Sequence, residues 1–207
     1  MKRIKNVLAP YFHKTRVEAG CDEAGRGCLA GPVFASAVIL PKGFHHALLN
    51  DSKQLSELDR DILRPIIEAE SISWSVKRVN PKMIDQINIL NASFRAMHLA
   101  VKDLTIQPEH LIIDGNRFTD YPGIPHTCII KGDAKYMAIA AASVLAKTHR
   151  DEYMKKISVI YPQFHWESNK GYPTQAHRQA VILHGRSVHH RKTFNVSPPQ
   201  INLFKKD

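Results

Sequence analysis

The chain has 207 residues, 43% of them hydrophobic, which is enough for one ordinary domain with a sizeable core. It has no run of about eighteen apolar residues and no signal-peptide pattern, so neither a membrane protein nor a secreted one is predicted. Its three cysteines lack metal-ligand spacing, which favours free thiols and a reducing, cytoplasmic compartment. The net charge of +10 favours a polyanionic partner over the alternative of a basic protein without one.

The first half of the chain predicts three strands and one helix. Strands are expected at 17–23 and 33–40, joined by a Gly-rich turn. Alternating apolar and polar residues over 71–79 predict a half-buried strand. Before it, Ser56 is typical of an N-cap, and the helix that follows is expected to be disturbed by Pro65.

The second half predicts three helices and two short strands. From Pro81, apolar residues recur at three- and four-residue steps, which predicts a long amphipathic helix. Short buried strands are expected at 110–114 and 126–131, followed by an Ala-rich helix over 134–157. One further helix is expected around 174–184. This order predicts an α/β domain with a mixed sheet and flanking helices.

Four carboxylates stand where predicted strands end. Asp22 and Glu23 end the first strand, Asp114 ends "LIID", and Asp133 follows "CIIKG". Ligand crevices of α/β sheets form at strand ends, and grouped carboxylates repel each other unless a cation holds them. A site for Mg²⁺ is therefore expected, since this ion prefers oxygen ligands. The alternative for each acid alone is a turn former or, at Asp133, a helix cap.

The adjacent acids raise a geometric objection. Neighbouring side chains on a regular strand point to opposite faces of the sheet. Asp22 and Glu23 can therefore contribute to one site only if the strand breaks at these two residues. Gly20 and Gly25 permit such a break because glycine tolerates backbone angles that other residues avoid. A broken strand at this position is the expectation.

The motifs "CDEAGRG", "LIIDGN", "KGDAKYMAIAAASVLAKTHRDE" and "NKGYPT" together resemble bacterial ribonuclease HII, over residues 17–194. The resemblance implies a ribonuclease H-like fold with a small C-terminal helical subdomain. It implies cleavage of RNA–DNA hybrids and nicking of duplex DNA 5′ of a single embedded ribonucleotide, leaving 3′-hydroxyl and 5′-phosphate ends. Two Mg²⁺ or Mn²⁺ ions would activate water and neutralise the leaving oxygen.

The resemblance also assigns roles to residues of this sequence. The metal-binding acids of the family fall on Asp22, Glu23, Asp114 and Asp133. Gly25, Arg26 and Gly27 match the motif whose backbone contacts the ribose 2′-hydroxyl, the group that distinguishes RNA from DNA. Tyr172 matches a tyrosine that packs on the sugar next to the cleaved bond, and Lys53 matches a lysine that contacts phosphate.

Other positions carry weaker expectations. Arg191 and Lys192 are expected to face phosphates, whereas the adjacent histidines, His189 and His190, are expected to make backbone contacts or lie at the surface. Asp151 shares a helix face with Ser143 and Lys147 and is expected not to bind metal directly. The two alternatives are a simple ion pair with Lys147 or a secondary contribution to positioning substrate or metal.

The tail segment "QINLF" resembles the peptide by which bacterial proteins dock on the sliding clamp, through Gln200, Leu203 and Phe204. The alternative is a tail that packs on the parent domain. The expected organisation is an N-terminal extension (1–16), a catalytic domain (17–157), a helical subdomain (158–197) and a flexible tail (198–207), in a monomer. The rival assignments are ribonuclease HIII, which normally carries an extra N-terminal domain, and a non-catalytic nucleic-acid-binding protein.

Overall fold

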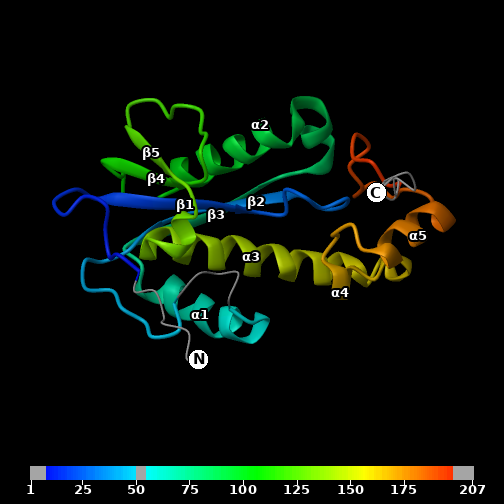
Figure 1. Cartoon of the computed structure of the whole chain (residues 1–207), viewed down its shortest axis with the longest axis horizontal. Helices are drawn as coiled ribbons and strands as arrows, with labels where there is room; N and C mark the ends of the chain where they lie inside the picture. Colours follow the sequence, from blue (N-terminus) through cyan, green and yellow to red (C-terminus); the bar gives the residue numbers. More distant parts are fainter. Residues whose placement is uncertain (1–7, 50–54, 198–207) are drawn as a thin grey trace, which may run out of the picture.

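The computed structural model describes residues 8–49 and 55–197, and these form a five-stranded sheet with helices on both faces (Figure 1). The sheet order is β3-β2-β1-β4-β5. β1 pairs antiparallel with β2 and parallel with β4, so the sheet is mixed as predicted. The strands are β1 (Glu18–Ala24), β2 (Val33–Ile39), β3 (Ser73–Val79), β4 (His110–Asp114) and β5 (His126–Ile129).

One long helix covers each face of the sheet, and a shorter helix joins one of the two layers (Figure 1). α2 (Pro81–Lys102) packs on one face, while α1 (Glu57–Glu70) and α3 (Met137–Ser158) lie on the other. All seven residues of β2 are buried, because both faces of this strand are covered. Among the described residues, no helix is both long and apolar enough to cross a membrane.

The close packing of α3 on β1 brings a helix directly beside the first predicted acid. A Cβ added at Gly20 would lie 2.2 Å from the backbone carbon of Ala138, so only glycine permits this approach. The pairing of β1 with β2 continues without interruption from Gly20 to Ala24. The expected break in the strand is therefore wrong, and Gly20 serves the contact between helix and sheet instead.

The C-terminal end of α3 carries a small helical cap that the sequence predicted only in part. α5 (Gln175–His184) matches the expected helix, whereas the short α4 (Trp166–Asn169) was not predicted. The cap buries Phe164 and Trp166 completely against Met154 of α3. Burying a side chain such as that of phenylalanine contributes about 1.5–3 kcal/mol to the stability of the fold, so these two aromatic residues help to hold the cap on α3.

Two helices differ locally from the prediction. α1 continues through Pro65 without ending there. α2 contains one residue with non-helical angles, Asn88, at φ 64°, so it consists of two helical segments across a kink. Asn88 accepts a hydrogen bond from the backbone of Asn91 and so caps the second segment.

Candidate active site

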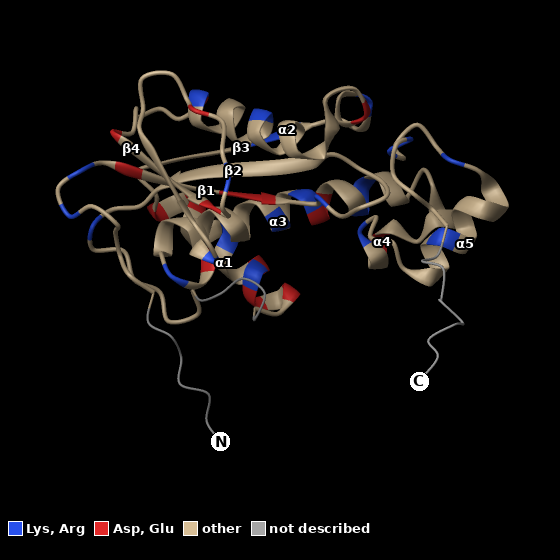
Figure 2. Cartoon of the chain, turned by 45° about the horizontal axis from the view of Figure 1, so that its top comes forward, with Lys and Arg blue, Asp and Glu red and all other residues tan. Residues whose placement is uncertain are grey.

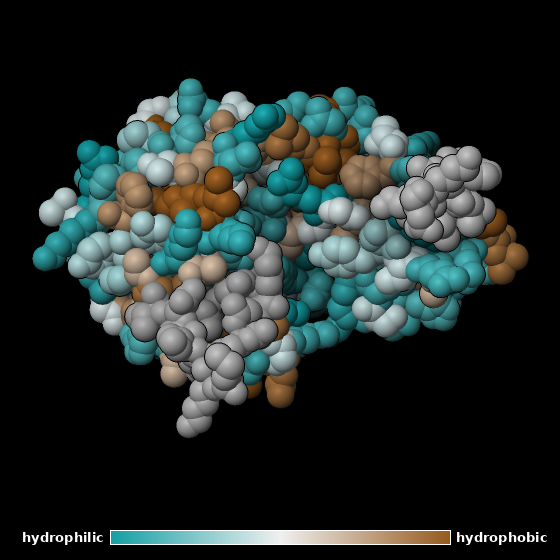
Figure 3. All heavy atoms as spheres, viewed as in Figure 1, coloured by the Kyte–Doolittle hydropathy of each residue, from teal (hydrophilic) through white to brown (hydrophobic). Residues whose placement is uncertain are grey.

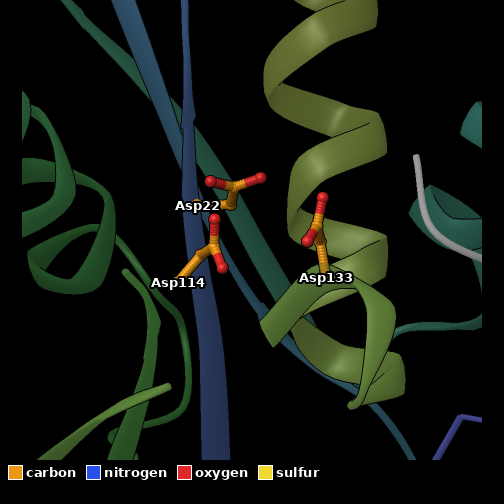
Figure 4. Close-up of side chains that lie close together, drawn as sticks. All are labelled: Asp22, Asp114 and Asp133. Atoms are coloured by element: carbon orange, nitrogen blue, oxygen red, sulfur yellow. The ribbon is translucent and has the colours of Figure 1, made fainter. Parts of the chain in front are cut away.

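Three carboxylates from separate segments meet beside the centre of the sheet (Figure 4). Asp22 lies on β1, Asp114 ends the parallel neighbour β4, and Asp133 lies in the 3₁₀ turn before α3. One oxygen of each lies within 4.8 Å of the others. The backbone N–H of Gly132 donates to Oδ1 of Asp114 at 2.7 Å, which ties the turn to the end of β4.

The environment of Asp22 opposes its ionisation. The carboxyl is only 4% exposed, and burial raises its pKa well above the usual value, as do the charges of Glu23 and Asp114. Lys147 and Ser143 on α3 act in the opposite direction, and Lys147 Nζ donates to Ser143 Oγ at 2.7 Å. Figure 2 shows acidic positions on β1 beside basic positions along α3. A bound cation would therefore stabilise the ionised form of these carboxylates.

Glu23 approaches this cluster from the other face of the sheet. Because β1 stays regular, its side chain points toward α2 and lines a cavity of about 300 Å³ together with Asp114. Burial raises the pKa of Glu23, while Arg26, whose Nη1 lies 3.1 Å from Oε1, lowers it. Three of the predicted acids thus form one cluster, and the fourth borders it through Asp114.

The donor set fits a hard divalent cation. Carboxylate oxygens are the ligands that Mg²⁺ and Mn²⁺ prefer, and a cation would offset the repulsion that now raises the pKa of Asp22. Asp22, Asp114 and Asp133 would hold it, with Glu23 next to them. Within the described ranges this is the one group of acidic, histidine or cysteine side chains with ligand spacing.

The Gly-rich segment that follows β1, residues 25–32, is held by a buried arginine. The Arg191 guanidinium donates to the carbonyls of Gly25 at 2.7 Å, Arg26 at 2.8 Å and Gly31 at 2.9–3.0 Å. Arg191 is 1% exposed, and burial lowers its pKa to about 10. The expectation that Arg191 faces phosphates is therefore wrong, since its guanidinium binds carbonyl groups inside the protein.

A second arginine, Arg150 of α3, binds the other side of segment 25–32. It donates to the carbonyls of Ala30 at 3.1 Å, Pro32 at 3.2 Å and Lys170 at 2.9 Å. Gly25 has φ +91°, and an added Cβ would lie 2.0 Å from Arg150 Nε. The sequence alone offered no signal for this role, because a helical arginine followed by Asp151 is typical of a solvated face.

Tyr172 lies on a loop that is attached to segment 25–32. The carbonyl of Gly171 accepts hydrogen bonds from the backbone N–H of Leu29 at 2.8 Å and of Ala30 at 3.4 Å. The tyrosine is 47% exposed, and Arg150 lies 5.8 Å from its ring centroid. Segment 25–32 and the tyrosine loop are therefore one connected unit beside the three acids.

A buried histidine pair supports this loop from behind. Nδ1 of His177 lies 2.9 Å from the carbonyl of Tyr172, and its Nε2 lies 3.2 Å from Nε2 of His190 and accepts from Trp166 at 3.0 Å. Burial lowers the pKa of both histidines, that of His190 to about 4. His190 is buried, so the surface alternative is wrong, but the expected backbone contact is present: the backbone N–H of Ser187 donates to Nδ1 of His190 at 2.9 Å.

The remaining predicted positions are of three kinds. Lys192 is exposed, and its backbone N–H donates to Asp85. Asp151 lies 4.0 Å from Arg60 and lines a cavity of about 290 Å³ with Lys147 and Tyr172, apart from the three acids. Lys53 and the tail positions Gln200, Leu203 and Phe204 lie outside the described residues.

Fold and site together define a metal-dependent nuclease with a ribonuclease H-like sheet. Residues 19–196 match the family model for ribonuclease HII, and the chain belongs to this family. It is therefore a ribonuclease H enzyme, an endoribonuclease acting on RNA–DNA hybrids. The match favours ribonuclease HII over the predicted rival ribonuclease HIII and over a non-catalytic binding protein.

Curated relatives cover almost the whole chain. Ribonuclease HII of Parabacteroides distasonis is 61% identical over 197 residues, which are 95% of this chain and 99% of the relative. Ribonuclease HII of Bacteroides thetaiotaomicron is 59% identical over 198 residues, with 95% and 99% covered.

Solved structures confirm the fold. Ribonuclease H2 from Pyrococcus horikoshii OT3 is 26% identical with a TM-score of 0.72, covering 86% of this chain and 94% of its own. A chain in the complex of PCNA with RNase HII from Archaeoglobus fulgidus has a similar fold, with a TM-score of 0.70 and 22% sequence identity. The match covers 89% of this chain and 98% of that chain.

Proposed function

We propose that this ribonuclease nicks duplex DNA on the 5′ side of a single embedded ribonucleotide, in addition to cutting the RNA strand of hybrids. The observation that carries the proposal is the position of segment 25–32, which lies at the end of the same strand, β1, that holds Asp22. A group that reads one ribose and a group that cuts one phosphodiester bond are then adjacent. One ribonucleotide is enough to satisfy both.

The residues divide the work of recognition. Gly27 has open space where a Cβ would stand, so a sugar can approach its backbone closely. Such an approach lets backbone groups contact the 2′-hydroxyl, which only RNA carries. Tyr172, half exposed on the attached loop, offers a flat face to the neighbouring sugar. Arg26 is half exposed beside Glu23 and adds positive charge toward a phosphate.

The acids serve the chemical step. Bound Mg²⁺ or Mn²⁺, as a pair, would supply activation of water and neutralisation of the leaving 3′-oxygen. Asp22, Asp114 and Asp133 fix where this charge sits relative to the ribose site, and Glu23 reaches the same place from the α2 side. Lys147 is placed to offset negative charge next to Asp22. The proposed products carry 3′-hydroxyl and 5′-phosphate ends.

The test uses duplex DNA with one ribonucleotide, with Mg²⁺, with Mn²⁺ and with a chelator. A single cut 5′ of the ribonucleotide, lost on chelation and absent from the all-DNA duplex, supports the proposal. Asp133→Asn should retain binding and lose most turnover, whereas Asp120→Asn, whose side chain is 95% exposed, should behave as the wild type. Cleavage of long hybrids without any cut at the single ribonucleotide contradicts it.

A partner proposal rests on the tail sequence alone. We propose that Gln200, Leu203 and Phe204 dock on the bacterial sliding clamp, with the two apolar side chains in a pocket of the clamp. The structure of a PCNA complex of an archaeal relative is consistent with clamp docking in that protein. Deletion of residues 199–207 should abolish clamp binding and leave cleavage of short duplexes unchanged; unchanged clamp affinity ends the idea.

A further inference from the structure

A large groove lies between α2 and the loop that joins β4 to β5, away from the three acids. Its volume is about 770 Å³. Its wall on α2 is one helix face, because the lining residues recur at three- and four-residue steps. No role in the site described above involves this groove. The residues used in the following argument are Phe94, Arg95, His98, Leu99, Lys102 and Tyr121.

The floor of the groove is apolar and aromatic. The rings of His98 and Tyr121 meet edge to face with centroids 5.2 Å apart, and Phe118 contacts both His98 and Phe94. Nε2 of His98 lies 2.9 Å from the carbonyl of Thr119, which holds the ring in place. Leu99 beside it is 38% exposed. The rings are therefore fixed before any ligand arrives.

The charged side chains that line the groove are all basic. Arg95 and Lys102 lie on its α2 wall, and none of the described residues that line it is acidic. Figure 2 shows basic positions along α2, and Figure 3 shows hydrophobic and hydrophilic side chains mixed over this layer. Fixed aromatic rings next to cations form the pattern with which proteins bind unpaired nucleotides, by stacking bases and neutralising phosphates.

The groove adjoins a cavity that reaches the catalytic acids. Phe94 lines both the groove and the neighbouring cavity of about 300 Å³, which also contains Glu23, Arg26 and Asp114. Arg117 also lines this cavity. A nucleic-acid strand bound at the three acids would therefore reach the groove past Arg26, Arg117 and Phe94. An acidic peptide would fit the cations too, but it has no reason to lie on a path that starts at a phosphodiester site.

We propose that the groove between α2 and the β4–β5 loop binds unpaired nucleotides of a strand that extends beyond the duplex held at the catalytic site. A paired strand hides its base faces in the stack, so only an unpaired one can use Tyr121 and His98. Arg95 and Lys102 bind the phosphates of the same nucleotides. The groove then selects substrates with a single-stranded tail, a property distinct from recognition of the ribonucleotide.

The test is a metal-free binding assay, so it does not depend on cleavage. Fluorescence anisotropy measures affinity for a blunt hybrid and for hybrids with a tail of about six unpaired nucleotides on the 5′ or the 3′ side of the cleaved strand. One tail polarity should increase wild-type affinity about ten-fold or more, from stacking and phosphate contacts. Arg95→Ala/Lys102→Ala should remove most of this gain, and Tyr121→Ala should reduce it.

The matched control is Arg16→Ala/Lys42→Ala. These two cations line a small cavity beside the start of β1 that also includes Ala138 of α3, on the face of the sheet opposite α2, so the same charge is removed elsewhere. This variant should keep the gain, and all variants should cut blunt hybrids normally. The two double charge variants should melt near the wild-type temperature, whereas Tyr121→Ala, whose ring packs on His98 and the core, is compared at a temperature at which it remains folded. The proposal is overturned if neither tail increases affinity, if the groove variant keeps the gain, or if the control loses it equally. Binding of an acidic peptide without any tail effect also overturns it.

Discussion

Replacing Arg191 tests whether a buried cation holds the ribose-reading segment in place. The guanidinium makes four hydrogen bonds to three carbonyls of segment 25–32 and lies 5.0 Å from the ring of Phe194. Arg191→Ala removes all of these contacts and leaves buried carbonyls without their donors. Arg191→Lys keeps a charge, but a single ammonium cannot reproduce the planar fork of donors.

The magnitude follows from the number and burial of these bonds. Hydrogen bonds to a charged group contribute about 1.5–3 kcal/mol each, but those made by one group are not additive. A loss of about 3–5 kcal/mol in the free energy of unfolding is expected for Arg191→Ala, and somewhat less for Arg191→Lys. In a protein of this size, about 2–4 °C is lost per kcal/mol, so the melting temperature should fall by roughly 10 °C.

The assay separates stability from positioning. Thermal melting gives the first, and kinetics at about 10 °C, where each variant remains folded, gives the second. Because misplacement by about 1 Å can lower rates about 100-fold, kcat/KM for a duplex with one ribonucleotide should fall at least ten-fold in the folded variant. Arg64→Ala is the control, since its guanidinium binds the carboxylates of Glu68 and Glu152 at 2.8 Å, outside segment 25–32 and the tyrosine loop. Equal melting temperatures for wild type and Arg191→Ala, or full low-temperature activity, would refute the reasoning.

Three further predictions concern glycine, histidine and metal. Gly25→Ala should lower the melting temperature because its Cβ meets Arg150, whereas Gly27→Ala, with open space there, should melt normally and raise KM for ribonucleotide substrates. Burial lowers the pKa of His190 from 6.5 to about 4. As the pH falls, this histidine therefore binds a proton in the unfolded state before it does so in the folded state. Stability should therefore rise by about 3 kcal/mol between pH 4 and 6.5 and stay level above, measured by urea unfolding; His190→Gln should flatten this slope, unlike a change at an exposed histidine. Finally, Mg²⁺ should raise the melting temperature of the wild type and not of Asp133→Asn; equal shifts would contradict the ligand assignment.

Local pattern predicted most of the elements and the acids. Local pattern located all five strands and the four long helices. Alternation predicted β3, short apolar runs and turn residues predicted the other strands, and α2 and α3 were predicted from helical spacing and from Ala-rich composition. The position of Asp114 and Asp133 directly after apolar strands indicated a shared strand-end site. Three of the predicted acids indeed lie together.

The direction in which a side chain points could not be predicted from local sequence where packing between distant segments determines it. A regular β1, paired with β2 and with the distant β4, sends Glu23 toward α2 and Asp22 toward α3. Gly20 of the same strand lets Ala138, more than a hundred residues later, pack directly on it. Similarly, "HHRKTF" predicted a basic surface, yet His190 is buried against the aromatic cap.

The sequence by itself determined the kind of chemistry: strand-end carboxylates, a glycine-rich turn after β1 and an excess of positive charge follow from residue type and short spacing. The tertiary structure alone decided which charged groups face the substrate and which are structural. Arg191 contacts segment 25–32 across 160 to 166 residues of chain, and Arg150 does so across 118 to 120. A charged side chain can be buried only where the fold provides enough carbonyl groups to replace its hydrogen bonds to water. Those carbonyl groups come from distant segments, so short sequence patterns do not predict them.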